Sequence, residues 1–145
     1  KLKAELEAGK FEFQTDFSSG DTVYQSDLVI TDWSSIAMEF SFTTCKPSLF
    51  INTPMKVMNP NYRELNLEPL DLSLRDQLGR SVELDAVGST AGQAVADLLA
   101  DAEGYRERIG KLVYELMPNF GHSGEIGGKY LLHSLQEKIK NRKDD

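Results

Sequence analysis

The run from Ser26 to Phe40 (SDLVITDWSSIAMEF) constrains the fold more than any other part of this 145-residue chain. Its residues 28–31 are apolar or β-branched and lack the polar alternation of a half-exposed strand, which indicates a strand buried on both faces. A polar turn and a serine pair follow. The residues from Ile36 onward are apolar nearly all round, as in a buried helix. The pattern predicts a strand that ends in a tight turn and leads directly into a helix.

A second hydrophobic strand is expected at 48–51. Lys46-Pro47 ends the preceding helix, because the residue before a proline disfavours helical geometry. Strand, helix and strand in this order form a βαβ unit with a right-handed crossover, so the two strands run parallel. We therefore predict an α/β fold with a parallel sheet and helices on both faces, in a single domain over 1–145.

The other expected elements follow from local patterns. They are a helical tail over 1–8, a strand over 11–14, a short helix over 21–26, an irregular segment over 52–80, a short edge strand over 82–84, and helices over 89–100, over 105–117 and from Ser123 to the charged end. The chain starts without methionine and inside a helix-like pattern, so we expect it to be part of a longer protein.

The composition excludes several classes of function. The net charge of -7 and the acidic pI near 4.9 argue against nonspecific binding to nucleic acid and against attachment to anionic lipid. No apolar run is long enough to predict a transmembrane segment. Cys45 is the single cysteine, which leaves no internal disulfide or cysteine zinc site and is typical of a reducing cytoplasm. We interpret Cys45 as a packing thiol, and we expect no metal and no cofactor.

The serine pair marks a candidate anion site. Ser34 or Ser35 is a good N-cap, because a serine oxygen accepts a hydrogen bond from a free NH group of the first helical turn. The remaining NH groups and the helix dipole favour an anion, most simply a phosphate, at the carboxyl end of the strand. Open α/β sheets usually bind ligands at that edge. The alternative is that the serines only cap a helix.

The segment from Ser26 to Ile51 resembles the carboxy-terminal part of the CDP-glycerol glycerophosphotransferase family. The resemblance is carried by the apolar strand, the order Thr-Asp-Trp-Ser-Ser, the helix, and Lys-Pro-Ser-Leu-Phe-Ile; the segment 121–128 is similar to the closing segment of the family. It implies a Rossmann-like, three-layer fold and the C-terminal half of a GT-B-type enzyme. It also implies that this half holds a CDP-linked donor for a teichoic-acid-type polymer of the bacterial cell envelope.

The resemblance assigns roles around the first strand. Ser34 and Ser35 would hold a phosphate of the donor, with Thr31 at the same turn. Asp32 is a poor direct neighbour of a phosphate, because like charges repel; we expect its carboxylate to accept hydrogen bonds from loop NH groups. Trp33 either lies against a ring of the donor or seals the turn.

More distant residues extend this site. Glu39 lies one helical turn beyond the serines. Its carboxylate either accepts a hydrogen bond from a hydroxyl of a ribose or glycerol, or it lies on a solvated face of the helix. Arg63 and Lys56 are the cations that we consider in the irregular segment. Arg63 either binds the pyrophosphate or is an ordinary solvated cation of the loop, and Lys56 is interpreted as a solvated side chain. His122 is the weak candidate for a catalytic base, and His133 is interpreted as a surface histidine.

After Ile51 the chain departs from the family pattern, which leaves the donor open among CDP-glycerol, CDP-ribitol and a nucleotide sugar. The full-length protein would act at the inner face of the membrane, on a lipid-linked polymer acceptor held by an N-terminal half outside this sequence. The 145-residue chain alone would bind donor without turnover. The alternative function is a noncatalytic α/β module that binds a protein partner.

Overall fold

The computed structural model describes residues 14, 21–55, 57 and 59–141 of the chain. The helix predicted over 1–8 lies outside the described residues. So does the strand predicted over 11–14, except for Gln14, which lies outside any strand.

Three strands form one parallel sheet in the order β1-β2-β3. They are β1 (Val29–Thr31), β2 (Ser48–Asn52) and β3 (Gly79–Glu83). The register places Ser48 of β2 beside Val29 of β1 and beside Gly79 of β3. The predicted parallel pair is confirmed, and the predicted edge strand exists but begins earlier, at Gly79. The expectation that the first strand is buried on both faces was wrong: β1 is itself an edge strand, and the side chain of Ile30 is exposed.

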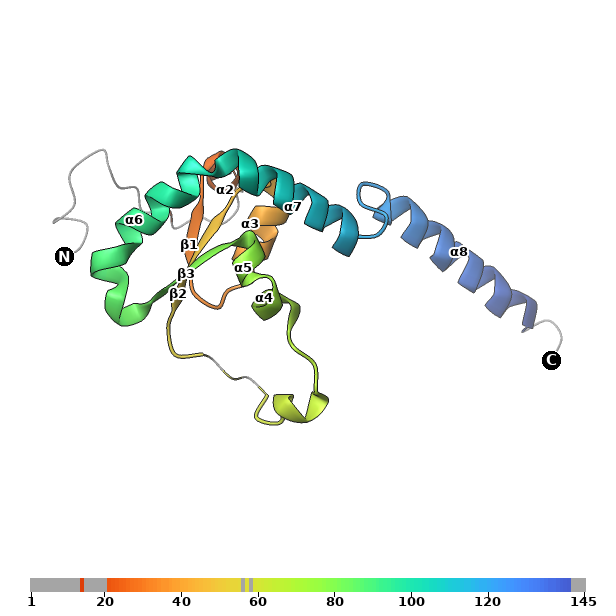
Figure 1. Cartoon of the computed structure of the whole chain (residues 1–145). Helices are drawn as coiled ribbons and strands as arrows, with labels where there is room; N and C mark the ends of the chain where they lie inside the picture. Colours follow the sequence, from red (N-terminus) through yellow and green to blue (C-terminus); the bar gives the residue numbers. More distant parts are fainter. Residues whose placement is uncertain (1–13, 15–20, 56, 58, 142–145) are drawn as a thin grey trace.

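Helices occupy most of the remaining described chain (Figure 1). In chain order they are α2 (Asp21–Gln25), α3 (Ile36–Thr44), the 3-10 helix η1 (Tyr62–Leu65), α4 (Leu70–Ser73), α5 (Arg75–Leu78), the 3-10 helix η2 (Leu84–Ala86), α6 (Val87–Ala100), α7 (Ala102–Leu116) and α8 (Ser123–Asn141). The helices predicted from apolar periodicity are confirmed with small shifts at their starts. The segment 52–80, expected to be irregular, contains the short helices η1, α4 and α5, and its last two residues belong to β3.

The sheet is flanked by helices on both faces, which confirms the predicted α/β class. The face that carries Ser48 meets α3, where the hydroxyl of Ser48 hydrogen-bonds that of Ser41 at 2.9 Å. The opposite face meets α6, where Arg80 of β3 donates to Asp97. Figure 1 shows α3 and α5 on one side of the strands and α6 on the other, with α7 crossing over α3 and α5.

The core lies between the central strand and these helices. Its most buried large side chains come from five elements: Phe40, Leu49, Leu78, Leu98 and Ile109. Because β2 lies between two neighbours and under helices on both faces, its first three residues are all buried. This burial is why the central strand is a continuous apolar run rather than an alternating one.

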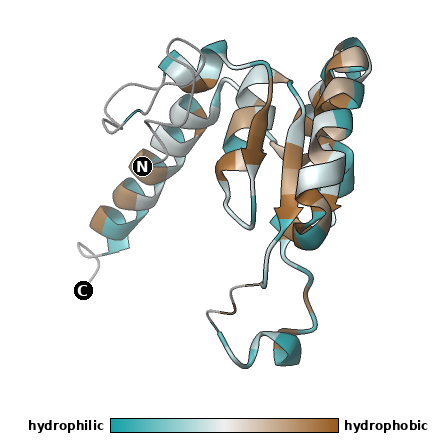
Figure 2. Ribbon diagram, turned by 90° about the vertical axis from the view of Figure 1, so that its left-hand side faces the viewer, coloured by the Kyte–Doolittle hydropathy of each residue, from teal (hydrophilic) through white to brown (hydrophobic). Residues whose placement is uncertain are grey.

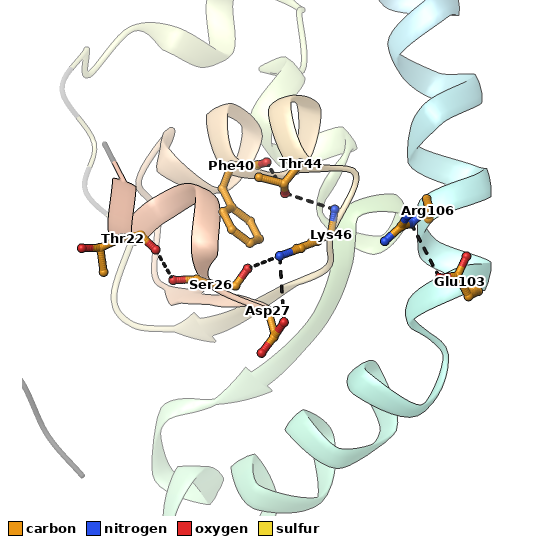
Figure 3. Close-up of polar contacts among 8 residues, drawn as sticks. All are labelled: Thr22, Ser26, Asp27, Phe40, Thr44, Lys46, Glu103 and Arg106. Atoms are coloured by element: carbon orange, nitrogen blue, oxygen red, sulfur yellow. Dashed lines mark hydrogen bonds and ion pairs between the residues drawn. The ribbon is translucent and has the colours of Figure 1, made fainter. Parts of the chain in front are cut away.

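Polar contacts fix the amino ends of β1 and β2 (Figure 3). The ammonium of Lys46, just before β2, donates to the main-chain oxygen of Ser26 at 2.7 Å and lies 3.9 Å from the carboxylate of Asp27. At the end of α3, the hydroxyl of Thr44 donates to the oxygen of Phe40 and accepts from the NH of Lys46. The crossover from β1 to β2 is therefore anchored where the two strands begin. Because the strands are parallel, their carboxyl ends lie together at the opposite edge of the sheet.

The last helix, α8, extends away from the sheet and its covering helices (Figure 1). None of its residues is buried. Among the described residues, no helix is long and apolar enough to cross a membrane.

Candidate functional site: a pocket at the carboxyl edge of the sheet

A pocket of about 220 Å³ lies where β1 and β2 end. Its walls are the turn between β1 and α3, the first turn of α3, the loop that follows β2, and α4 with α5. Figure 1 shows this loop extending from the same edge of the sheet. The lining side chains are mostly apolar or aromatic: Asp32, Trp33, Ser34, Ala37, Met38, Phe50, Met55, Val57, Asn59, Tyr62, Pro69, Asp71, Leu72, Arg75 and Leu78. The pocket is thus at the edge where the sequence predicted ligand binding.

Arg75 is the cation of this pocket. Its side chain is only 8% exposed, and its guanidinium donates to the main-chain oxygen of Asp32 at 2.9 Å and to the amide oxygen of Asn52 at 2.8 Å. Both acceptors are neutral, and within the described part of the chain no carboxylate forms an ion pair with Arg75. Burial lowers the pKa of Arg75, against the opposing effect of nearby carboxylates, first that of Asp76. Arg75 is therefore a largely buried cation that has neutral hydrogen-bond acceptors and three carboxylates nearby, those of Asp76, Asp32 and Asp71.

Two aromatic rings lie against this guanidinium. Its carbon is 4.1 Å from the centre of the Trp33 ring and 4.4 Å from that of Phe50. Contacts of this kind stabilise a desolvated cation through the negative face of the ring. The indole NH of Trp33 also donates to the main-chain oxygen of Thr53 at 2.7 Å. Trp33 therefore closes the turn onto the loop after β2, as in the sealing role considered for it, and still lines the pocket.

A hydrogen-bond chain joins the carboxyl ends of the three strands. Glu83, at the end of β3, accepts from the amide of Asn52 at 2.6 Å; Asn52, at the end of β2, accepts from Arg75. Arg75 in turn donates to Asp32, just after β1. This chain holds the guanidinium in one orientation at the edge of the sheet.

The two serines differ in their surroundings. Ser34 lines the pocket, and its hydroxyl accepts from the NH of Ile36 over a long 3.4 Å. Ser35 is the N-cap residue by backbone position, but its side chain makes no capping bond; its hydroxyl instead donates to Glu39 at 3.4 Å. Ser35 and Glu39 are exposed and do not belong to the pocket lining.

Asp32 differs from its expected role. Among the described residues, no loop NH donates to its carboxylate, and the turn is held by its main-chain oxygen, which accepts from Arg75. Thr31 is half-buried at the end of β1 and lies outside the pocket lining. Among the described residues the guanidinium of Arg75 thus provides the bond that holds this turn.

Other predicted residues lie away from the pocket. Arg63 is exposed on η1, and its Nε donates to the hydroxyl of Tyr62 at 3.2 Å, a bond that raises the pKa of Arg63. Tyr62 lines the pocket, whereas Arg63 does not. His122 lies in the turn before α8, and His133 lies on α8; both are exposed. Lys56 lies outside the described residues.

Sequence reasoning missed Arg75, because it considered only Arg63 and Lys56 in the irregular segment. A signal was present: Leu70, Leu74 and Leu78 recur at helical spacing and surround the arginine with apolar residues. An arginine within such a pattern has its stem, and here also its charge, drawn into the core.

The fold and the pocket define a parallel α/β domain with an apolar, aromatic binding site that contains a buried cation at the carboxyl edge of the sheet. Within the described residues, no group of three or more side chains is arranged to hold a metal ion. No protein-family model, curated protein or solved structure matches the chain.

Proposed function

We propose that this chain is the donor-binding part of a CDP-glycerol glycerophosphotransferase or a related transferase of bacterial cell-envelope polymer synthesis. One observation carries the proposal: at the carboxyl edge of a parallel sheet, the buried guanidinium of Arg75, the hydroxyl of Ser34 and the start of α3 border one pocket. A nucleoside diphosphate matches these features, because it joins a flat ring to an anion.

The donor would use the two kinds of wall differently. Its base would lie on the aromatic wall near Trp33 and Tyr62, and its diphosphate would lie between Ser34 and Arg75. Arg donates a planar fork that fits phosphate oxygens, and Arg75 has NH groups beyond the two already bonded. Asp71 also lines the pocket, so its carboxylate limits how closely a phosphate approaches that side.

Residues outside the lining would contact the parts of the donor that extend beyond the pocket. Ser35 and Glu39 lie side by side on the first turn of α3 and would meet a ribose or glycerol hydroxyl. Arg63, on the loop beside Tyr62, would neutralise charge at the mouth, and Thr31 would position the turn.

The chemical step would need a second, N-terminal half in a GT-B-type arrangement, which would supply the base and the lipid-linked acceptor at the inner face of the membrane. His122 would approach that half only if the turn before α8 faces it. The chain by itself is therefore expected to bind donor without turnover.

The test is titration of the chain with CDP-glycerol, CDP and UDP by calorimetry. Trp33 is the single tryptophan, so its fluorescence reports the same pocket. We expect binding of the CDP species that weakens about tenfold in Ser34→Ala, from the loss of one hydrogen bond to a charged group. Ser89→Ala, at the exposed start of α6, is the matched control. Absence of binding by every nucleotide would refute the proposal.

A second candidate is a noncatalytic module that binds a basic protein partner, favoured by the net charge of -7. The same titration separates the two, because this module would give no heat with any nucleotide.

A further inference from the structure

The helix α8 carries an apolar face that no other described residue covers. By the helical period of 3.6 residues this face, the α8 stripe, runs through Gly124, Gly128, Leu131, Leu132, Leu135 and Ile139. The exposed fractions of its four aliphatic side chains range from 49% to 69%. Brown bands mark apolar residues along α8 in Figure 2, and Figure 1 shows the helix standing clear of the sheet and its covering helices. The α8 stripe is thus free to contact another surface.

The α8 stripe is thin in its first half and bulky in its second half. Gly124 and Gly128 give it no side chains near its start, and a Cβ built at either glycine meets nothing within 4 Å outside the backbone of its own helix. Glycine inside a helix is destabilising relative to alanine. Among the described residues no close contact requires these two glycines, whereas the close approach of another helix would account for both.

We propose that α8 pairs with α8 of a second copy of this chain, with the two helices antiparallel. One register suits the whole stripe, with a twofold axis beside its midpoint. The facing residues of the two copies are then Gly124 with Ile139, Gly128 with Leu135, and Leu131 with Leu132. Bulky side chains fill the space that the glycines leave, and the same contacts repeat on both sides of the axis, as in an isologous interface.

The charges of α8 suit the antiparallel pair. Glu125 is in the first turn of the helix, whereas Lys138 and Lys140 are in the last turn. Glu125 and Lys140 lie on the same side of the α8 stripe, so the antiparallel pair brings Glu125 of each copy beside Lys140 of the other. Along their own helix these residues already form ion pairs, Glu125 with Lys129 and Lys140 with Glu137, and the contact between copies extends both pairs. A parallel pair would instead place like ends of the helix dipoles together.

A bilayer fits the α8 stripe less well than a second copy does. The two glycines offer no side chain to insert, and Glu125 at the margin of the stripe would meet the headgroups. The stripe has six residues, fewer than the roughly 20–30 residues that each partner contributes to a standard interface. We therefore expect a dimer that dissociates on dilution.

Sedimentation equilibrium of the full 145-residue chain over a concentration series tests the pairing. We expect the mass of one chain at low concentration and an approach to twice that mass at high concentration. Leu135→Asp should raise the dissociation constant of the dimer about tenfold or more, since it removes apolar contact and places a charge in the interface. Tyr130→Asp, on the opposite face of the same helix and 70% exposed, is the matched control and should dimerise as the unchanged chain does.

Disulfide crosslinking tests the register. In a Cys45→Ser background, which removes the single cysteine of the chain, a Gly124→Cys variant and an Ile139→Cys variant are mixed and oxidised. We expect the disulfide between the two different variants to form about tenfold faster than either disulfide between identical chains, because only the antiparallel pair brings these two positions within reach.

The proposal is overturned if the chain keeps the mass of a single chain at every concentration, or if the two aspartate variants lose the dimer equally. Disulfides that form as fast between identical chains would also overturn it, as would binding to phosphatidylglycerol vesicles by a chain that stays monomeric. None of the substituted residues lines the pocket, so the outcome is independent of nucleotide binding.

Discussion

The guanidinium carbon of Arg75 lies 4.1 Å from the centre of the Trp33 ring, which joins α5 to the turn between β1 and α3. A lysine at position 75 keeps the charge but lacks the planar fork that reaches Asp32 and Asn52 together. We expect Arg75→Lys to lower the free energy of unfolding by about 2–3 kcal/mol, through lost hydrogen bonds and weaker ring contacts. Urea denaturation followed by circular dichroism measures this.

Arg63→Lys is the control for that variant. Arg63 is exposed and bonds only its neighbour Tyr62 among the described residues, so its replacement should leave the urea midpoint unchanged. Equal urea midpoints for the two variants would show that Arg75 does not hold the turn.

The indole NH of Trp33 supports the same turn from the other side. In Trp33→Phe the ring contact with Arg75 remains, but the oxygen of Thr53 loses its donor. We expect a loss of about 1 kcal/mol, measured by thermal denaturation with circular dichroism because the variant has no tryptophan. Tyr114→Phe, at an exposed ring, should leave the melting temperature unchanged. A Trp33→Phe variant as stable as the unchanged chain would mean that the bond to Thr53 does not form in solution.

The hydroxyls of Ser41 and Ser48 form a fully buried pair between α3 and β2. Each single alanine variant leaves the other hydroxyl without this partner and should cost about 1–3 kcal/mol. The double variant removes both polar groups, so it should cost less than the sum of the two. A double-mutant cycle in urea measures this coupling. Additive effects would indicate that the hydroxyls do not bond each other.

The elements that the sequence predicts correctly are those that form because of residues close to one another in the chain. The βαβ unit from β1 to β2 was predicted correctly from its two apolar strands and the Lys46-Pro47 stop between them. Burial on both faces explains the apolar run of β2 only, because β1 lies at the edge of the sheet and its Ile30 is 53% exposed. The helices α4 and α5 have four residues each, too short to form without tertiary packing, so their signal in the sequence is limited to the spacing of Leu70, Leu74 and Leu78 across both. The edge of the sheet was predicted as the ligand site from the turn at Ser34.

The charge at that site was not predicted, because the partners of Arg75 are brought together only by the fold. Asp32, Asn52 and Phe50 come from the ends of two strands, and nothing in the residues next to Arg75 indicates them. A buried cation forms through contacts between residues far apart in the sequence, so local patterns do not predict it. A helix N-cap forms through contacts with residues next to it, so local patterns do predict it. Arg63 looked equivalent in sequence and is exposed for the same reason: the fold places no acceptors around it except Tyr62, among the residues that the structure describes.

The close approach of β2 and β3 at Ser48 and Gly79 gives the strictest test of the strand register. Gly79 has an extended backbone that any residue adopts, but a Cβ there would overlap the main-chain oxygen of Ser48 in the neighbouring strand. In Gly79→Ala the two strands must separate, while the oxygen of Gly79 also accepts from the buried hydroxyl of Tyr105. We expect a loss of at least about 3 kcal/mol, the scale of core overpacking.

A glycine-to-alanine substitution on α7 should change the free energy of unfolding in the opposite direction. A Cβ at Gly110 meets nothing within 4 Å outside its own helix, so Gly110→Ala should stabilise the chain by about 0.5–1 kcal/mol, because alanine loses less backbone entropy than glycine in a helix. Urea denaturation of both variants compares the two signs directly. If Gly79→Ala proves as stable as the unchanged chain, β3 does not pair with β2 in this register, and the hydrogen-bond chain from Glu83 through Asn52 to Arg75 loses its support.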